Sequence, residues 1–525
     1  MCKMGSGLRR CMVLVGVLVL VVPLLFVFAA PVSAAGTIRV DGDAAGCVNT
    51  SGQSNPYGVV YCKIQDAVTD ASGEDTIHVY PRTGVYDESV NLTAMQSPGS
   101  ITLVTVNNAG TPTPGTVTVD YHDKPSEFFT SASLDGDLTI DGFIVHSAAP
   151  GIDVAVDGGA GANRNVVIRN VTATETEHDG IQVSADGNVT ISNCIASDND
   201  FSGIHVAGAG GDVVITDSTA NGNGRYGILV DVPGPASTET GVAAGVVGGE
   251  ITITNCTANE NSEDGFFVAG SATDGVRAAN ASGGDVTISN CTANGNVESG
   301  FDPVDILGVL TIQDCIAQDN DDGVDLDEMG QAAGVLVKGN IICGNKCGLD
   351  NPVTQLNAEG NWWGCAGGPE AAGCDPICEP QTDSILVDFT PWISRISASA
   401  TVDPAMVGQP TVVSFQFSGN PSAVYLGQGP GDLHGDPVFV VSTDNGVVSS
   451  SGFIGDAQGT LEVTLTPAHT GTATVWVDGP CGLDESIVLG VVAAEEFVPE
   501  PGTVLLLGSG LMGLAGYAGL RLRKR

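Results

Sequence analysis

Aspartates at one repeated position form the clearest chemical pattern in this chain. Asp302, Asp325 and Asp350 each lie two residues after a glycine of a recurring unit, and Asp327 follows Asp325 closely. If the units stack as strands, neighbouring carboxylates lie about 5 Å apart and repel by roughly 3 kcal/mol at an effective dielectric of 20. A Ca²⁺ ion bound by carboxylate oxygens would bridge such a pair. The pattern therefore predicts either a Ca²⁺ site at Asp302, Asp325, Asp327 and Asp350 or a solvated acidic edge.

Two histidines are placed where a general acid or base could act. His205 lies at the same repeated position as the aspartates, and His178 lies in the preceding unit. An outward histidine is more often a plain surface residue, and an acidic chain supplies many carboxylate pairs by chance. His178, His205, Asp302 and Asp325 are therefore weak catalytic candidates. The sequence contains no Gly-rich phosphate loop, H-E-x-x-H motif or nucleophile elbow.

Adjacent tryptophans suggest a second kind of site. Trp362 and Trp363 lie in the segment GNWWG, after the last recurring unit. Their rings have the size and shape to stack on sugars, but large aromatic side chains also fill the end of a core. Both interpretations remain open from the sequence, as glycan-stacking residues or as a plug.

The element that would position these residues is a repeat of about two dozen residues. Each unit carries a β-branched run, a polar turn and a G-I-x-V strand, and its period with short strands predicts a solenoid. The apolar-x-apolar alternation after each glycine places one strand face inside. The anchoring glycines are Gly151, Gly180, Gly203, Gly227, Gly265, Gly300, Gly323 and Gly348.

A polar column runs between the two strands of each unit. Asparagine tolerates the left-handed turn conformation, and stacked amides hydrogen-bond along a column. We therefore expect a ladder in which asparagines also make the turn. Its members are Asn199, Asn223, Asn261, Asn296, Asn320 and Asn345.

The cysteines divide into two groups. Cys194, Cys256, Cys291 and Cys315 share one repeat position and predict a buried column of free thiols. Cys47 with Cys62 predicts a disulfide in an exported protein. Further disulfides are expected among the loop cysteines between 343 and 378, with connectivity left open and no obvious partner for Cys481.

Stacked parallel strands, tight turns and an asparagine column resemble the right-handed parallel β-helix of the pectin-lyase-like superfamily. The resemblance covers residues 36–393, with an N-terminal cap helix at 64–71 and a Trp/Cys-rich C-terminal cap. It is specific for fold and weak for function, because this scaffold hosts lyases, hydrolases, epimerases and non-enzymes. Alternating strands over 394–493 resemble a bacterial Ig-like β-sandwich, so the expected fold class is all-β.

The chain ends indicate export. Residues 1–34 have a basic start, an apolar run and a small-residue cleavage site, as in a signal peptide. After a linker at 494–498, residues 499–525 carry Pro499-Glu500-Pro501, an apolar span at 502–520 and a basic end. This order resembles the PEP-CTERM sorting signal, which implies an exosortase-type enzyme as partner. It also implies anchoring in the inner membrane of a Gram-negative bacterium before processing, and then the cell surface or extracellular matrix.

Charge narrows the classes of partner. The chain carries 18 basic and 61 acidic residues, for a formal net charge of −43. Without the seven basic residues and one acidic residue of the two terminal segments, 11 basic and 60 acidic residues remain, a net charge of about −49. Such a surface repels nucleic acid, anionic lipid and polyuronates, and it attracts cations.

These features favour an exported, non-catalytic protein of the cell surface or exopolysaccharide matrix. Its rigid acidic β-helix would bind extracellular polysaccharide, Ca²⁺ or both. The alternative is a polysaccharide-active enzyme (a lyase, hydrolase or epimerase) of the β-helix superfamily.

Overall fold

A computed structural model describes the chain from residue 36 to residue 493, with gaps. The residues outside the description are 1–35, 54, 96–98, 122–133, 135, 148–149, 157–162, 232–248, 270–283, 328, 330–331, 351–355, 370, 379–386, 391, 393–394, 419–439, 450–459, 479–480, 482–483 and 494–525. The predicted signal peptide, linker and sorting tail all lie outside it. Within the described residues no helix is long and apolar enough to cross a membrane.

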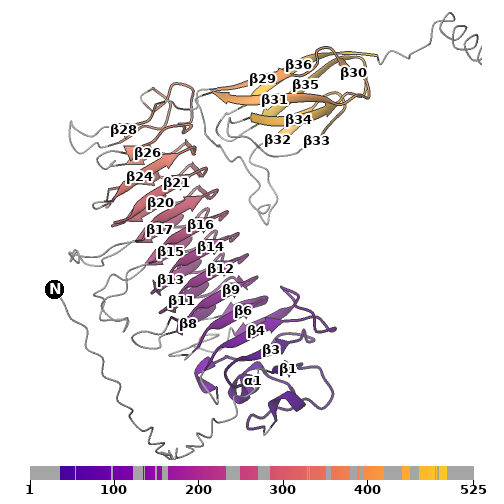
Figure 1. Cartoon of the computed structure of the whole chain (residues 1–525), viewed down its shortest axis with the longest axis vertical. Helices are drawn as coiled ribbons and strands as arrows, with labels where there is room; N and C mark the ends of the chain where they lie inside the picture. The colour runs from indigo at the N-terminus through magenta and orange to yellow at the C-terminus, as the bar shows by residue number, and fades with distance from the viewer. Residues whose placement is uncertain are drawn as a thin grey trace, which may run out of the picture. The chain divides into compact units, whose positions relative to one another are not determined.

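Most of the described chain forms a parallel β-helix whose coils stack in sequence order (Figure 1). Its longest sheet has fourteen strands, all paired in parallel, because each coil adds one strand beside the equivalent strand of the coil before. The strands of this sheet are β2 (Val60–Tyr61), β1 (Thr37–Val40), β3 (Asp75–Val79), β4 (Ile101–Thr105), β6 (Leu138–Asp141), β9 (Val166–Arg169), β12 (Val189–Ser192), β14 (Val213–Thr216), β16 (Ile251–Thr254), β18 (Val286–Ser289), β21 (Val309–Gln313), β24 (Gly334–Lys338), β27 (Leu356–Asn357) and β28 (Val387–Asp388).

A second parallel sheet contains the G-I-x-V strands. Its members are β8 (Ile152–Val156), β11 (Ile181–Ala185), β13 (Ile204–Ala209), β15 (Ile228–Asp231), β17 (Phe266–Ala269), β20 (Ser299–Val304), β23 (Asp322–Asp325) and β26 (Cys347–Asp350). Two three-stranded sheets complete the coils. They contain β5 (Val117–Tyr121), β7 (Phe143–Ser147) and β10 (Thr172–Ala173), and β19 (Thr292–Asn294), β22 (Ile316–Gln318) and β25 (Ile341–Cys343).

The predicted cap helix is α1 (Ile64–Asp70). Its apolar residues enter the core, and Glu88 accepts hydrogen bonds from the first two amides, Ile64 N at 2.8 Å and Gln65 N at 3.0 Å. The carboxylate thus replaces the missing N-cap side chain. Two short 3-10 turns lie nearby, η1 (Pro56–Gly58) and η2 (Leu92–Ala94).

The asparagine ladder forms as predicted. Each side-chain amide donates to the next amide oxygen, as from Asn199 to Asn223 at 3.1 Å and from Asn261 to Asn296 at 2.9 Å. The ladder ends on the cap residue Asp375, whose Oδ2 accepts from the Asn345 side chain at 2.8 Å. Self-complementary donors and acceptors therefore satisfy a fully buried polar column.

One detail of the ladder prediction is wrong. The ladder asparagines do not have the left-handed conformation; the residue before each does, as in Asp198, Glu260 and Asp319 with φ of 57–58°. The buried amide needs its side chain directed along the column, so the turn strain falls on the exposed neighbour. The coil glycines recur for a related reason, since a Cβ on Gly180 would lie 2.6 Å from the Asn199 side-chain nitrogen.

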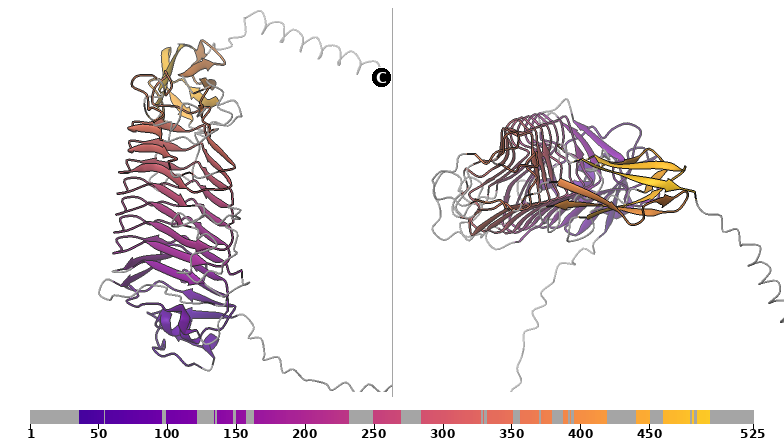
Figure 2. Two further views of the ribbon diagram at one scale, coloured as in Figure 1. Left: turned by 90° about the vertical axis from the view of Figure 1, so that its left-hand side faces the viewer. Right: turned by 90° about the horizontal axis from the view of Figure 1, so that it is seen from above.

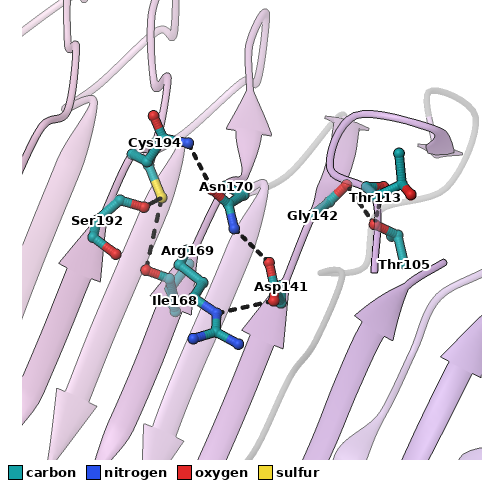
Figure 3. Close-up of polar contacts among 10 residues, drawn as sticks. Thr105, Thr113, Asp141, Gly142, Ile168, Arg169, Asn170, Ser192 and Cys194 are labelled. Atoms are coloured by element: carbon teal, nitrogen blue, oxygen red, sulfur yellow. Dashed lines mark hydrogen bonds and ion pairs between the residues drawn. The ribbon is translucent and has the colours of Figure 1, made fainter. Parts of the chain in front are cut away.

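The four column cysteines are free and buried, as predicted. Cys194 shows the local geometry, because its thiol donates to Ser192 O at 3.3 Å and lies 3.8 Å from Ile168 O (Figure 3). Beside it, the Asp141 carboxylate accepts from Arg169 Nε at 2.9 Å and from Asn170 Nδ2 at 2.6 Å. Further along the chain, Asn340 and Asn361 continue the thiol column after Cys315, which the sequence analysis did not identify.

Disulfides lie near both caps. Cys47 pairs with Cys62, the pair predicted from the sequence, with an S–S distance of 1.99 Å. The loop cysteines pair as Cys347–Cys378 and Cys365–Cys374, and Cys343 pairs with Cys481. Five cysteines in one cluster leave an odd number, which Cys481 completes.

Residues 395–492 form two four-stranded, mostly antiparallel sheets (Figures 1 and 2). Val413, Phe415 and Val463 from one sheet share a core with Val475 and Leu489 from the other. The region is therefore a β-sandwich, while its Ig-like assignment stays a prediction. The first sheet contains β29 (Arg395–Ala400), β31 (Thr411–Ser418), β33 (Val447–Ser449) and β34 (Thr460–Thr466), and the second β30 (Ala405–Met406), β32 (Val440–Thr443), β35 (Gly471–Asp478) and β36 (Glu485–Val492).

Candidate functional site

Polar and aromatic side chains cover one surface line of the β-helix, here called the surface strip. For the coils from Gly180 to Gly348, it is drawn from the two residues before each coil glycine and the residue two positions after it, leaving out Gln182, Ser202, Leu229, Ser299 and Cys347 at these positions. Its members are His178, Asp179, Phe201, His205, Arg225, Tyr226, Glu263, Asp264, Phe267, Glu298, Asp302, Asp321, Asp322, Asp325, Lys346 and Asp350. Backbone hydrogen bonds hold the turn part in register, as from Arg225 N to Phe201 O at 3.1 Å and from Lys346 N to Asp321 O at 2.9 Å.

The strip contains a carboxylate–imidazole pair. His205 Nδ1 lies 3.0 Å from Asp179 Oδ2, and Asp179 Oδ1 accepts from Ser202 N at 2.8 Å. Burial opposes ionisation of Asp179, but the His205 contact and the Ser202 amide outweigh it and lower the pKa of this carboxyl. An ionised carboxylate on Nδ1 favours the tautomer that leaves Nε2 as an acceptor.

Aromatic contacts continue the strip across the next coils. The rings of His178 and Phe201 stack with centroids 5.1 Å apart, and Phe201 is 41% exposed. Tyr226 contacts Phe267 at 5.1 Å between centroids. Phe201 is exposed and Tyr226 and Phe267 are half-buried, and these three side chains are here called the aromatic platform.

Arg225 connects the aromatic part to the first carboxylate. Its guanidinium donates to both oxygens of Glu263, from Nε at 3.1 Å and from Nη2 at 3.3 Å, and it lies 5.0 Å from the Tyr226 ring centroid. The same coil spacing thus pairs opposite charges here.

Carboxylates dominate the strip from Glu263 onward. Burial raises the pKa of Asp264 to about 7, with Glu298 and Asp325 adding to the effect against the Ser299 amide. Burial and the nearby Asp350 raise the pKa of Asp322 to about 6. Lys346 pairs with Asp321. This acidic part therefore carries more negative charge than its bases neutralise.

The structure places the predicted Ca²⁺ residues in two groups. Asp325 and Asp350 are direct partners on β23 and β26, and the pairing of Phe301 with Val324 puts Asp302 in the same column. Asp327 lies beyond the strand, where its amide donates to Asp325 Oδ1 at 2.9 Å. Among the described residues no group of three or more His, Cys, Asp or Glu is arranged to hold a metal ion. The Ca²⁺ site stays a prediction.

The glycan-stacking prediction for the tryptophans is wrong. Trp363 is fully buried in the β-helix core and Trp362 is 5% exposed, so neither ring presents a face to a ligand. Trp363 fits the alternative interpretation, because a solenoid must close its last coil and this ring lies in the β-helix core, whereas Trp362 packs in a separate cluster with Ile341 and Cys343.

The sequence analysis found His178, His205 and the aspartate column but missed most of the strip. It aligned only residues after each glycine, whereas Phe201, Arg225, Tyr226, Glu263 and Asp264 lie just before it. Extending the same alignment two residues upstream would have shown this column.

Comparisons with known proteins agree on the fold. Residues 130–301 match the family model described as right handed beta helix region, which confirms the predicted handedness and fold class. Residues 497–524 match the PEP-CTERM protein-sorting motif. The chain thus carries a sorting motif of exported, membrane-anchored proteins of Gram-negative bacteria. No curated protein matches significantly.

Solved structures resemble the chain only distantly. A pectate lyase is 15% identical, with a TM-score of 0.41 over 65% of this chain and 82% of the lyase. A periplasmic alginate epimerase is 11% identical, with a TM-score of 0.30 over 60% of this chain and 76% of its own. A rhamnogalacturonan lyase is 12% identical, with a TM-score of 0.28 over 68% and 87%. Similarities at this level carry no information about activity.

Proposed function

We propose that the protein is an exported component of the cell surface or extracellular matrix that binds polysaccharide along the surface strip without cleaving it. The observation that supports this proposal is the aromatic platform of Phe201, Tyr226 and Phe267. Pyranose rings have apolar faces that pack on such side chains, and side chains fixed by stacked strands need little ordering on binding.

Coil geometry fits a polymeric ligand. Parallel strands repeat about every 4.8 Å, which is comparable to the length of one sugar ring. A chain lying along the strip would meet side chains of one further coil at each step, first mostly aromatic and then mostly acidic. Sorting by an exosortase-type enzyme would then retain the protein where exopolysaccharide accumulates.

The test uses full-length protein in mild detergent with the producing cell's own exopolysaccharide, followed by size-exclusion chromatography. We expect co-elution with a polymer of unchanged size. Phe201→Ala and Phe267→Ala should weaken binding about fivefold or more, while the exposed sandwich variant Val447→Ala should not. Equal binding by all variants at matched melting temperature would contradict the proposal.

A second candidate function is a polysaccharide-active enzyme. The Asp179–His205 pair favours it, because an imidazole oriented through Nδ1 keeps Nε2 as the acceptor that general base catalysis needs. In that case the polymer would elute later as it is shortened. His205→Ala and Asp302→Asn should then remove turnover while leaving the protein folded.

A further inference from the structure

We propose that the ligand of the surface strip is a cationic amino-sugar polymer, bound with its rings on the aromatic part and its ammonium groups on the acidic part. This inference rests on the proposed glycan-binding function and adds the chemical class of the glycan.

The first support is the continuity of aromatic and acidic side chains. Tyr226 contacts Phe267, and Phe267 on β17 is the direct strand partner of Asp302 on β20. A ring packed on Phe267 would therefore carry its substituents toward carboxylates. Neutral glycans would use only the aromatic half of this arrangement.

The second support is the regular spacing of the carboxylates. Glu298 N donates to Glu263 O at 3.4 Å, and Asp321 N donates to Glu298 O at 2.9 Å. This column therefore places one carboxylate on each of three successive coils, about 4.8 Å apart. Glu263 is paired with Arg225 and Asp321 with Lys346, so Glu298 is the carboxylate of this column that an ammonium group would meet.

The third support is the local charge balance. In the described part of the chain Asp322 makes no ion pair, whereas Glu263 and Asp321 do. Burial and the carboxylates of Asp350 and Asp325 raise the pKa of Asp322 to about 6, and an ammonium group would favour its ionised form. Asp264 is only 3% exposed, so it adds negative charge beneath the surface without contacting a ligand.

The experiment compares two probes on the full-length protein by titration calorimetry at pH 6.5. One probe is a β-linked glucosamine oligomer and the other is its fully N-acetylated counterpart. We expect the glucosamine oligomer to bind about tenfold more tightly than its N-acetylated counterpart.

Two sets of variants assign the effect to residues. Glu298→Gln and Asp322→Asn should each weaken glucosamine binding about fivefold and leave N-acetylated binding unchanged. Glu250→Gln is the matched control, because Glu250 lies directly before β16 and is exposed like Glu298. This variant should change the affinity for neither probe. Phe267→Ala should weaken both probes. Melting temperatures establish that each variant is folded.

The failures are distinguishable. Equal affinity for both probes overturns the amino-sugar inference and leaves the proposed function standing. If the protein binds neither probe but still binds the native exopolysaccharide, the amino-sugar inference is likewise overturned and the proposed function stands. A third probe, poly-L-lysine, tests for general attraction of cations. If it displaces glucosamine oligomers and binds the Phe267→Ala variant as tightly as the native protein, the strip is a polycation surface and the inference is overturned.

Discussion

The β-helix contains two polar columns that follow the same repeat but differ in burial, hydrogen bonding and charge repulsion. The asparagine ladder is buried and each amide both donates to and accepts from its neighbours, as at Asn223 and Asn261. The outward aspartates, such as Asp325 and Asp350, stack in the same register but carry like charges. A polar side chain stacked on identical side chains stabilises the coils by hydrogen bonding only when it is both a donor and an acceptor.

The comparison explains where function can arise. The ladder needs no ligand, because its amides satisfy one another and Asp375 closes the end. The acidic part contains more carboxylates than basic residues, so its net negative charge favours cations. Within one scaffold, the self-complementary column maintains the fold, and the acidic part belongs to the surface that we propose for binding.

The largest expected effect comes from breaking the ladder. Asn261→Ala removes the acceptor of Asn223 N and Nδ2, each at 3.0 Å, and leaves these donors buried. We expect a loss of about 3 kcal/mol, because buried unsatisfied donors carry their full desolvation cost. Thermal unfolding of the full chain measures it.

The neighbouring variant Ser262→Ala is its control. Ser262 is exposed, so its truncation should change stability by less than about 0.5 kcal/mol. Similar losses for the two variants would mean that the ladder amides contribute nothing beyond the surface.

Removing a carboxylate from the acidic part should have the opposite effect on stability. The pKa of Asp322 is raised to about 6 by burial and carboxylate neighbours, so its ionised form destabilises the fold as pH rises through 6. Asp322→Asn should therefore stabilise the protein by about 1 kcal/mol at pH 8, discounted for partial exposure, and change little at pH 4.

Unfolding at the two pH values tests this prediction, with Glu250→Gln as the control of equal charge change. A variant that is destabilised at pH 8 would show that Asp322 has a compensating partner at neutral pH.

The smallest effect is expected in the thiol column. Ser218 already occupies that column, where its hydroxyl donates to Thr216 O at 2.8 Å and accepts from Cys194 N at 3.2 Å. Cys291→Ser should reproduce these bonds with Ser289 O and Cys256 N, within about 1 kcal/mol of the native stability.

Denaturation of this variant beside Asn261→Ala provides the comparison. A loss as large as that of the ladder variant would mean that sulfur packing, rather than hydrogen bonding, determines the residue type at this position.

Several features of the fold could be predicted because the same residue type recurs at one position in many repeats. The strands, the inner aliphatic positions, the thiol column and the asparagine ladder each follow from residue type at a fixed offset. The Cys47–Cys62 pair also agreed with expectation, since two nearby cysteines in an exported chain have few alternatives.

The site was less predictable because it depends on diagonal contacts between coils. Asp179 contacts His205, and Tyr226 contacts Phe267, in each case from the turn of one coil to the strand of the next. Alignment by offset alone treats these positions as separate columns. The burial of Trp363 was equally undetermined, because a ring that can stack on sugar can also fill a core.

The sequence by itself determined the repeat, its inward and outward faces, the net charge and the sorting motif, because these depend on local periodicity and composition. The tertiary structure decided which charges are paired, which residues have the left-handed turn conformation, which cysteines join and where the aromatic platform lies. Those outcomes depend on distances between coils, and only stacking brings these residues within contact.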